Sequence, residues 1–282
     1  MVAAQMQGGF DLHTHSVRSD GTTTPSAIAQ EAAAIGLDGF ALTDHDTVAG
    51  WDEARIAAAS AGVEFLPGIE LTTHTGVRSA HLLAYGPDPL DLELGAKMAL
   101  LRDSRVSRAR AMADLLAVDF EVDWDAVLLA AGRSVGRPHL ADALVAAGFA
   151  ADRSAAFETI LSPRGPYYMP IYALETVEAV KLVRAAGGLP VLAHPAAHRM
   201  RAPFSAAELG ELASAGLWGV ELEHPENRAD WVVSLRAAAV DLGLVVTGAS
   251  DYHGAGKPNR LGEQRTGTEL VAEIRDRVAT PR

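Results

Sequence analysis

Nine side chains that commonly bind metals recur at or just after the ends of short apolar runs in this chain. Six are imidazoles and three are carboxylates: His13, His15, Asp20, His45, Glu70, His81, His194, Asp251 and His253. A single histidine is usually an ordinary core or surface residue, but histidines placed at random would not recur at the ends of so many apolar runs. Crowded carboxylates and imidazoles are costly unless cations neutralise them, so the pattern predicts bound metal ions.

The first of these clusters is Asp11-Leu-His13-Thr-His15, which follows an apolar start. Residues two apart in a strand point to the same side, so His13 and His15 can chelate one ion. The absence of cysteine excludes thiolate ligands, thiol nucleophiles and disulfides. Imidazole and carboxylate ligands suit manganese, zinc or iron, and manganese is our first choice.

The elements that must position these ligands are short apolar runs alternating with helical patterns, as in a parallel barrel or a doubly wound sheet. We expect strands at Phe10–His15, Gly39–His45, Glu64–Leu71, Ser79–Tyr85, Leu189–His194, Trp218–Glu223 and Leu244–Ala249. Thr24-Pro25 and the capping box Ser205-Ala-Ala-Glu208 mark the starts of two crossover helices. Active sites of parallel barrels lie at the carboxyl ends of the strands, where these ligands are found.

The alternation stops between residues 100 and 171, where the pattern is helical throughout. We expect helices at Leu101–Ala117, Trp124–Ala131, His139–Ala147 and Arg153–Leu161. We therefore divide the chain into a barrel domain, residues 1–99 and 172–282, and a small helical insertion, residues 100–171, that caps the substrate. Extra outer helices of the barrel are the alternative.

Composition restricts the partners of this chain of 282 residues. A net charge of −12, from 24 basic and 36 acidic residues, disfavours duplex nucleic acid. No apolar run is long enough to cross a membrane, and the start lacks the features of a secretory signal. We expect a cytoplasmic protein without membrane or duplex partners.

The motifs resemble those of the PHP (polymerase and histidinol phosphatase) family, from Phe10 to about Gly262. In chain order they are H-x-H, a downstream acid, T-D-H, G-x-E, a further histidine, A-H-P and S-D-x-H. The resemblance implies an α/β fold, a distorted (β/α)7 TIM-like barrel, with three divalent ions. It assigns His13, His15, Glu70 and Asp251 to the first ion, Glu70, His81 and His194 to the second, and Asp20, His45 and His253 to the third.

Three divalent ions would bring about +6, against about −3 from Asp20, Glu70 and Asp251, the three carboxylates to which we give catalytic roles. Such a site favours an anion, and a bridging water would be acidified to hydroxide and aimed at phosphorus. We therefore expect a metal-dependent phosphoric monoester hydrolase, a phosphatase, acting on a small phosphorylated substrate.

The insertion supplies cations that the barrel lacks. We expect Arg105, Arg137, His139 and Arg164 to contact substrate, joined by His224 at a strand end in the barrel. Gly136-Arg-Pro-His139 resembles a PHP subgroup that hydrolyses the 3′-phosphate of nucleoside 3′,5′-bisphosphates, with relatives that act on short RNA from 5′ to 3′. A proline-fixed turn at a helix start can present guanidinium and backbone N–H groups to a phosphate.

Three alternatives remain open at this point. A histidinol-phosphate phosphatase would share the barrel and ions, but its substrate ammonium would favour acidic pocket groups over arginines. A two-metal amidohydrolase would not need the set Asp20, His45 and His253. A non-catalytic PHP binding module would not need the full ligand set.

Overall fold

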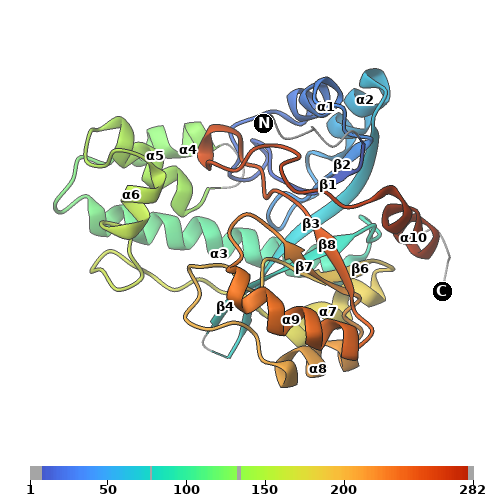
Figure 1. Ribbon diagram of the computed structural model, residues 1–282. Coiled ribbons are helices and arrows are strands. Elements are labelled where there is room, and N and C mark those ends of the chain that lie inside the picture. The colour runs from blue at the N-terminus through green and yellow to red at the C-terminus, as the bar shows by residue number, and fades with distance from the viewer. Residues whose placement is uncertain (1–7, 77, 132–134, 279–282) are drawn as a thin grey trace, which may run out of the picture.

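Eight strands form one curved sheet in the computed structural model, which describes residues 8–76, 78–131 and 135–278 (Figure 1). The strands are β1 Phe10–Thr14, β2 Gly39–Leu42, β3 Glu64–Thr75, β4 Arg78–Tyr85, β5 Leu174–Glu175, β6 Leu189–Leu192, β7 Gly219–Glu223 and β8 Val245–Gly248. Their order is β1-β2-β3-β4-β6-β7-β8, with the short β5 paired to the end of β3. The seven expected strands are all present, and β5 is an additional one.

The sheet curls so that the segments at the carboxyl ends of its first and last strands meet. The amide of His15 donates to the carbonyl of Tyr252 at 2.8 Å, and the amide of Tyr252 donates to the carbonyl of His13 at 3.2 Å. The expected distorted (β/α)7 barrel is therefore confirmed. The distortion lies at β4, which runs antiparallel to both β3 and β6, whereas β1-β2-β3 and β6-β7-β8 are parallel.

The β3–β4 hairpin also changes where two ligands lie. We expected the third strand to end at Leu71, but β3 continues to Thr75, so Glu70 lies in its middle. His81 pairs with Thr72 across the hairpin. Ile69 and Leu71 pack in a buried apolar cluster, and strand alternation turns Glu70 to the opposite face.

The described residues form ten α-helices and a short 3₁₀ helix in addition to the sheet. They are α1 Pro25–Ala34, α2 Trp51–Ala61, α3 Leu92–Leu116, α4 Trp124–Ala131, α5 Arg137–Ala146, α6 Arg153–Glu158, α7 Thr176–Ala185, α8 Ala206–Ala215, α9 Ala229–Asp241, η1 Gly254–Gly256 and α10 Thr268–Val278. Both predicted starts are observed, because Thr24 caps α1 and Ser205 forms a capping box with Glu208 at α8. Each helix within the described residues is too short or too polar to span a bilayer.

The last helix closes the end of the barrel opposite the ligands. Val271 and Ile274 of α10 belong to one buried cluster with Phe10, Tyr85 and Leu189, which lie at that end of the sheet. The other end is left to the loops after β1, β2, β6 and β8, which carry most of the candidate ligands.

The helices α4, α5 and α6 lie to one side of the barrel, at the far end of the long α3 (Figure 1). The second half of α3 shares a separate buried cluster with them, which includes Met112, Leu116, Leu140 and Leu144. The first half, with Leu94 and Met98, packs in the cluster beside the barrel. Helix α3 runs without a break through residue 100, where we expected the insertion to begin, and it therefore links the two apolar cores.

Candidate metal centre

Glu70 lies at the centre of the nine residues singled out from the sequence. Its Oε2 is 3.2 Å from His13 Nε2, 3.0 Å from His15 Nε2 and 3.3 Å from His45 Nδ1. Its Oε1 is 2.7 Å from His81 Nδ1 and 3.1 Å from His194 Nε2. One buried carboxylate thus faces five imidazoles from four different segments, so it is placed to bridge two ions.

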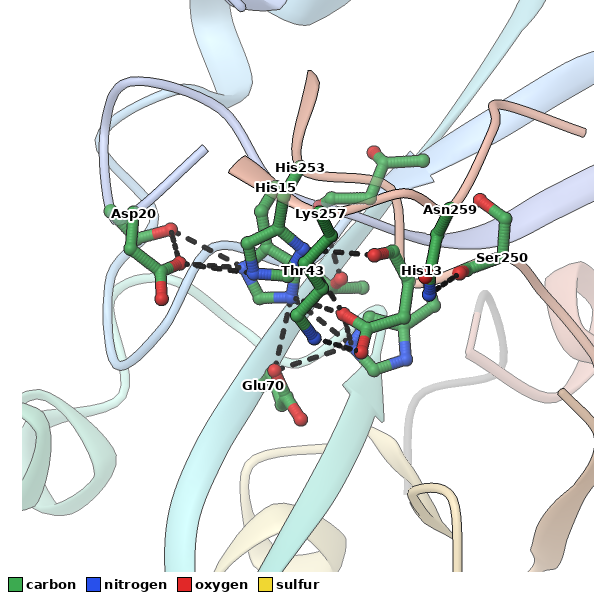
Figure 2. A network of polar contacts seen from close by, with 12 residues as sticks. His13, His15, Asp20, Thr43, Glu70, Ser250, His253, Lys257 and Asn259 are labelled. Carbon is green, nitrogen blue, oxygen red and sulfur yellow. Dashed lines mark hydrogen bonds and ion pairs between the residues drawn. The ribbon is translucent and has the colours of Figure 1, made fainter. Parts of the chain in front are cut away.

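Asp20 gathers a second group on the other side of His15 (Figure 2). Its carboxylate oxygens lie 3.6 Å from His15 Nδ1, 3.8 Å from His45 Nε2 and 3.3 Å from His253 Nε2. The rings of His15 and His253 stack with centroids 4.1 Å apart. These four residues could hold one ion between them.

Asp251 completes a third group with His13, His15 and Glu70. Its Oδ1 is 3.5 Å from the Nε2 atoms of both His13 and His15. A further possible group joins Glu70 to His45 and His81. His194 Nε2 also lies near the Glu70 carboxylate. The other nitrogen of this ring, Nδ1, lies 3.1 Å from Nη2 of Arg199.

The cluster contains buried atoms that lack a proper hydrogen bond. They are His45 Nδ1, His81 Nδ1, His224 Nε2 and Asp251 Oδ1. Buried polar atoms are normally satisfied, and each one left without a partner costs about 1–3 kcal/mol. Divalent ions would satisfy several of them together, and the imidazole and carboxylate donors suit such ions. The residues present therefore fit a metal centre.

The carboxylates of the cluster are held in their ionised form, whereas His13 must lose a proton when a cation binds, because Glu221 and Glu70 outweigh burial and raise its pKa well above its ordinary value. Burial raises the pKa of Glu70, but His81 and His45 outweigh it, and the pKa lies well below its ordinary value. The pKa of Asp20 is likewise well below its ordinary value, because His253 and His45 outweigh burial. Burial, aided by Arg105, holds the pKa of His45 well below its ordinary value. Ionised carboxylates and neutral imidazoles are the forms that bind metals.

Three residues in this region adopt a left-handed backbone that non-glycine residues rarely use. They are Asp46, His194 and Asp251, with φ of 55°, 29° and 55°. Such conformations cost about 1–3 kcal/mol each and cluster at functional sites. Two of the three carry candidate ligands, and Asp46 directly follows a third.

Glu221, which the sequence motifs did not predict, contacts two of the candidate ligands. It is fully buried in β7, where Oε1 lies 2.9 Å from His13 Nδ1 and Oε2 accepts the amide of His194 at 2.9 Å. Carboxylates behind ligating histidines fix the ring and its tautomer. Its place three residues before His224, at the end of an apolar run, was the available signal.

A charged network at the rim was also missed. Lys257 Nζ lies 2.5 Å from Asp251 Oδ2 and 3.5 Å from Glu226 Oε1, and Glu226 also pairs with Arg199. Lys257 therefore engages one oxygen of Asp251 and leaves Oδ1 facing His13 and His15. These contacts join three loops, and no local spacing in the sequence indicates them.

The residues predicted to contact substrate occupy different environments. Arg105 Nε pairs with Asp46 Oδ2 at 2.8 Å beside the cluster. His139 is buried at the start of α5, where its Nδ1 accepts the amide of Gly136 at 3.1 Å. His224 Nε2 lies 3.6 Å from Asp251 Oδ2.

The two remaining arginines lie in the insertion. Arg137 is half-buried over the ring of Phe157, with its guanidinium carbon 4.8 Å from the centroid. Arg164 is exposed in the loop that follows α6.

The PHP domain family matches residues 11–128. A 3′,5′-nucleoside bisphosphate phosphatase from Chromobacterium violaceum is 32% identical over 254 residues, 89% of either chain. A 5′-3′ exoribonuclease from Haemophilus influenzae is 29% identical, over 86% of this chain and 89% of its own. A phosphoribosyl 1,2-cyclic phosphate 1,2-diphosphodiesterase from Eggerthella lenta is 33% identical, over 86% and 94%.

Two solved structures share the fold. One, from Bifidobacterium adolescentis, is described as a proposed metal-dependent phosphoesterase; it is 41% identical with a TM-score of 0.93, over 96% of both chains. The other, from Chromobacterium violaceum, is described as an amidohydrolase with bound sulfate and no metal; it is 30% identical with a TM-score of 0.86, over 95% and 96%. The chain belongs to the PHP family of metal-dependent phosphoesterases, as the motifs predicted.

Proposed function

We propose that this protein is a three-metal phosphatase that removes the 3′-phosphate of nucleoside 3′,5′-bisphosphates. The observation that carries the metal centre is Glu70, whose two oxygens face five imidazoles within 3.3 Å. All nine ligand positions expected of the family lie around it or around Asp20 and Asp251. We propose manganese as the native metal, with zinc or iron as substitutes.

The ions, when bound, would supply positive charge to the phosphate and an acidified water as the nucleophile. The chain's own residues then have simple tasks. Glu70, Asp20 and Asp251 stay ionised and hold the cationic centre together, and Glu221 orients His13. Lys257, next to Asp251, keeps that carboxylate turned toward the cluster.

Substrate selectivity depends on a row of arginines along the insertion. Arg105 and Arg108 are one helical turn apart on α3, so they share a face that begins beside Asp46. Burial and Arg137 lower the pKa of Arg108 to about 10, and burial lowers the pKa of Arg137. Within the described ranges, no carboxylate pairs with Arg108 or Arg137, although both are partly buried beside Tyr168.

Crowded, partly buried cations without counter-charges are relieved by an anion. We propose that Arg108 and Arg137 bind the 5′-phosphate while the 3′-phosphate reaches the ions. Gly136 donates to Nδ1 of His139, so the neutral ring carries its proton on Nε2 and can donate to a phosphate oxygen. His224 would contact the scissile phosphate, and Arg164 would act only if the terminal loop of the insertion folds over the nucleotide.

We propose that the insertion acts as a substrate cap. Residues 100–171 would cover the nucleotide, and their separate apolar core would let them do so as one body. A short RNA with a 5′-phosphate presents the same pair of phosphates as a bisphosphate, so 5′-to-3′ trimming of short RNA is a compatible second activity. We also propose a cytoplasmic location.

Rates with purified, manganese-loaded protein test the proposal. Adenosine 3′,5′-bisphosphate should be hydrolysed with a much higher kcat/KM than 3′-AMP, which lacks the clamped phosphate, and 5′-AMP should be inert. Equal rates for the two 3′-phosphates would refute the clamp. Faster hydrolysis of histidinol phosphate would favour that alternative instead.

Metal analysis separates the remaining alternatives. About three ions per chain would distinguish the centre from a two-metal amidohydrolase. Glu70→Ala should abolish hydrolysis and metal retention together. Full metal loading without any phosphoesterase activity would favour a binding module.

A further inference from the structure

Arg153, the first residue of α6, reaches from the insertion to the loop that carries Asp20. Its Nη1 donates to the carbonyl of Asp20 at 2.9 Å. Its Nε and Nη2 form two parallel bonds to the carboxylate of Asp142 on α5, at 2.5 and 2.6 Å. The side chain of Arg153 is only 10% exposed, although Asp142 is 47% exposed. A planar guanidinium held by two bonds has little freedom left, so the third contact is well defined.

The same guanidinium packs against the loop that follows His253. A Cβ built on Gly256 of η1 would overlap Arg153 Nη1. The backbone of Gly256 is not left-handed, so its conformation does not require glycine. The lack of a side chain instead lets the Arg153 guanidinium approach the backbone closely. The loops of Asp20 and His253 are also joined directly, because the amide of Thr22 donates to the carbonyl of His253 at 3.0 Å. Arg153 therefore touches both loops that deliver Asp20 and His253 to one candidate ion.

The charges around Arg153 allow it to support the Asp20 loop without competing with the ion for the Asp20 carboxylate. Arg153 binds the backbone carbonyl of Asp20 and leaves its carboxylate to the imidazoles of His45 and His253. Asp142 neutralises the guanidinium, so the pair adds little repulsion toward a divalent cation. The contact thus fixes where Asp20 lies without occupying a ligand atom.

We propose that Arg153 is a positioning residue that couples the insertion to the ion assigned to Asp20, His45 and His253. The inference rests on the proposed metal centre. Because coupling between two sites is reciprocal, the insertion tightens this ion and the ion tightens the insertion. Binding of this one ion would then determine how firmly α5 and α6 are held against the end of the barrel that carries the ligands.

The first test is metal binding, measured by manganese titration with EPR and by metal content after dialysis. Arg153→Met should weaken one ion of the three by about 10- to 100-fold, the range for outer partners of metal ligands, and leave the others unchanged. Gly256→Ala should weaken the same ion by displacing the guanidinium. Arg153→Lys should restore part of the affinity, because an ammonium can still reach the Asp20 carbonyl.

Arg110→Met is the matched control, since Arg110 pairs with Asp114 on the exposed face of α3 in the same insertion. It should bind all ions as the wild type does, and circular dichroism should show every variant folded. If Arg153→Met and Gly256→Ala keep wild-type affinity for every ion, the coupling is refuted. An equal loss of all three ions in Arg153→Met would also refute it, because that is general destabilisation.

The second test is hydrogen exchange of the backbone amides of α5 and α6. Manganese should slow their exchange in the wild type and in Arg110→Met, and should have no effect in Arg153→Met. Unchanged exchange in a metal-loaded wild type would refute the coupling while leaving the metal centre intact. A wild type that binds no ions would instead remove the proposed function itself.

Discussion

Replacing Glu221 by glutamine tests whether the carboxylate beneath the cluster sets the ligands that it touches. Oε1 lies 2.9 Å from His13 Nδ1, and Oε2 accepts the amide of His194 at 2.9 Å. With its proton on Nδ1, His13 would present Nε2 to an ion shared with Glu70 and Asp251, whose oxygens lie 3.2 and 3.5 Å from that nitrogen. Glutamine keeps the shape of the side chain, but its NH2 group must face one of these two donors.

The size of the effect follows from that mismatch. A buried donor left without an acceptor costs about 1–3 kcal/mol, and about 1.4 kcal/mol corresponds to a factor of ten. We expect the ion bound by His13 to be held about 10- to 100-fold more weakly, because a reversed ring tautomer would place the proton on the ligating nitrogen. Hydrolysis at limiting manganese should fall by a similar factor and recover partly at saturating manganese.

Manganese titration followed by EPR measures the affinity directly. Glu223→Gln is the control, because Glu223 lies in the same strand but is half-exposed and pairs with Arg236 at the surface. Wild-type affinity for every ion in Glu221→Gln would refute the argument that this carboxylate orients His13.

Three further outcomes are expected. Chelation should lower the melting temperature and manganese should restore it, since each ion at 100 times its Kd adds about 2.7 kcal/mol; an unchanged melting temperature would contradict a structural role for the ions. Burial and Arg199 lower the pKa of His194 to about 4. In metal-free protein the neutral ring therefore contributes about 3 kcal/mol to the free energy of unfolding above pH 6.5, and this contribution is lost as the pH falls toward 4. Urea unfolding of His194→Gln at pH 7 and 4.5 should show a weaker pH dependence than the wild type, and an equal one would exclude this group as the cause. Arg137→Met should reduce kcat/KM for adenosine 3′,5′-bisphosphate by about 10- to 100-fold, the loss of one charge-assisted hydrogen bond, with 3′-AMP unaffected; an equal loss on both would remove Arg137 from the clamp.

The elements of the barrel were predictable because their signals are local. Apolar runs fixed seven strands to within a few residues, and Thr24-Pro25 and Ser205-Ala-Ala-Glu208 marked two helix starts that the structure confirms. Strand direction was not predictable in the same way. The antiparallel β4 depends on how the β3–β4 hairpin pairs, and its alternating pattern reads the same in either direction.

The candidate ligands were also visible one by one, since each follows or lies within an apolar run that had to become a strand. Their support was not visible. Glu221 and Arg153 act on His13 and Asp20, which lie more than 100 residues away in the chain, and Lys257 joins Asp251 to Glu226 in another loop, so local spacing does not indicate these contacts.

The sequence by itself determined the types of side chain, their attachment to strand ends and the family. Only the tertiary structure decided which oxygen of Asp251 faces the imidazoles, which arginines are already paired with carboxylates, and that the insertion contacts the Asp20 loop. The physical reason is that secondary structure follows from short-range periodicity, whereas the charge and geometry of a site depend on distances between segments that only folding brings together.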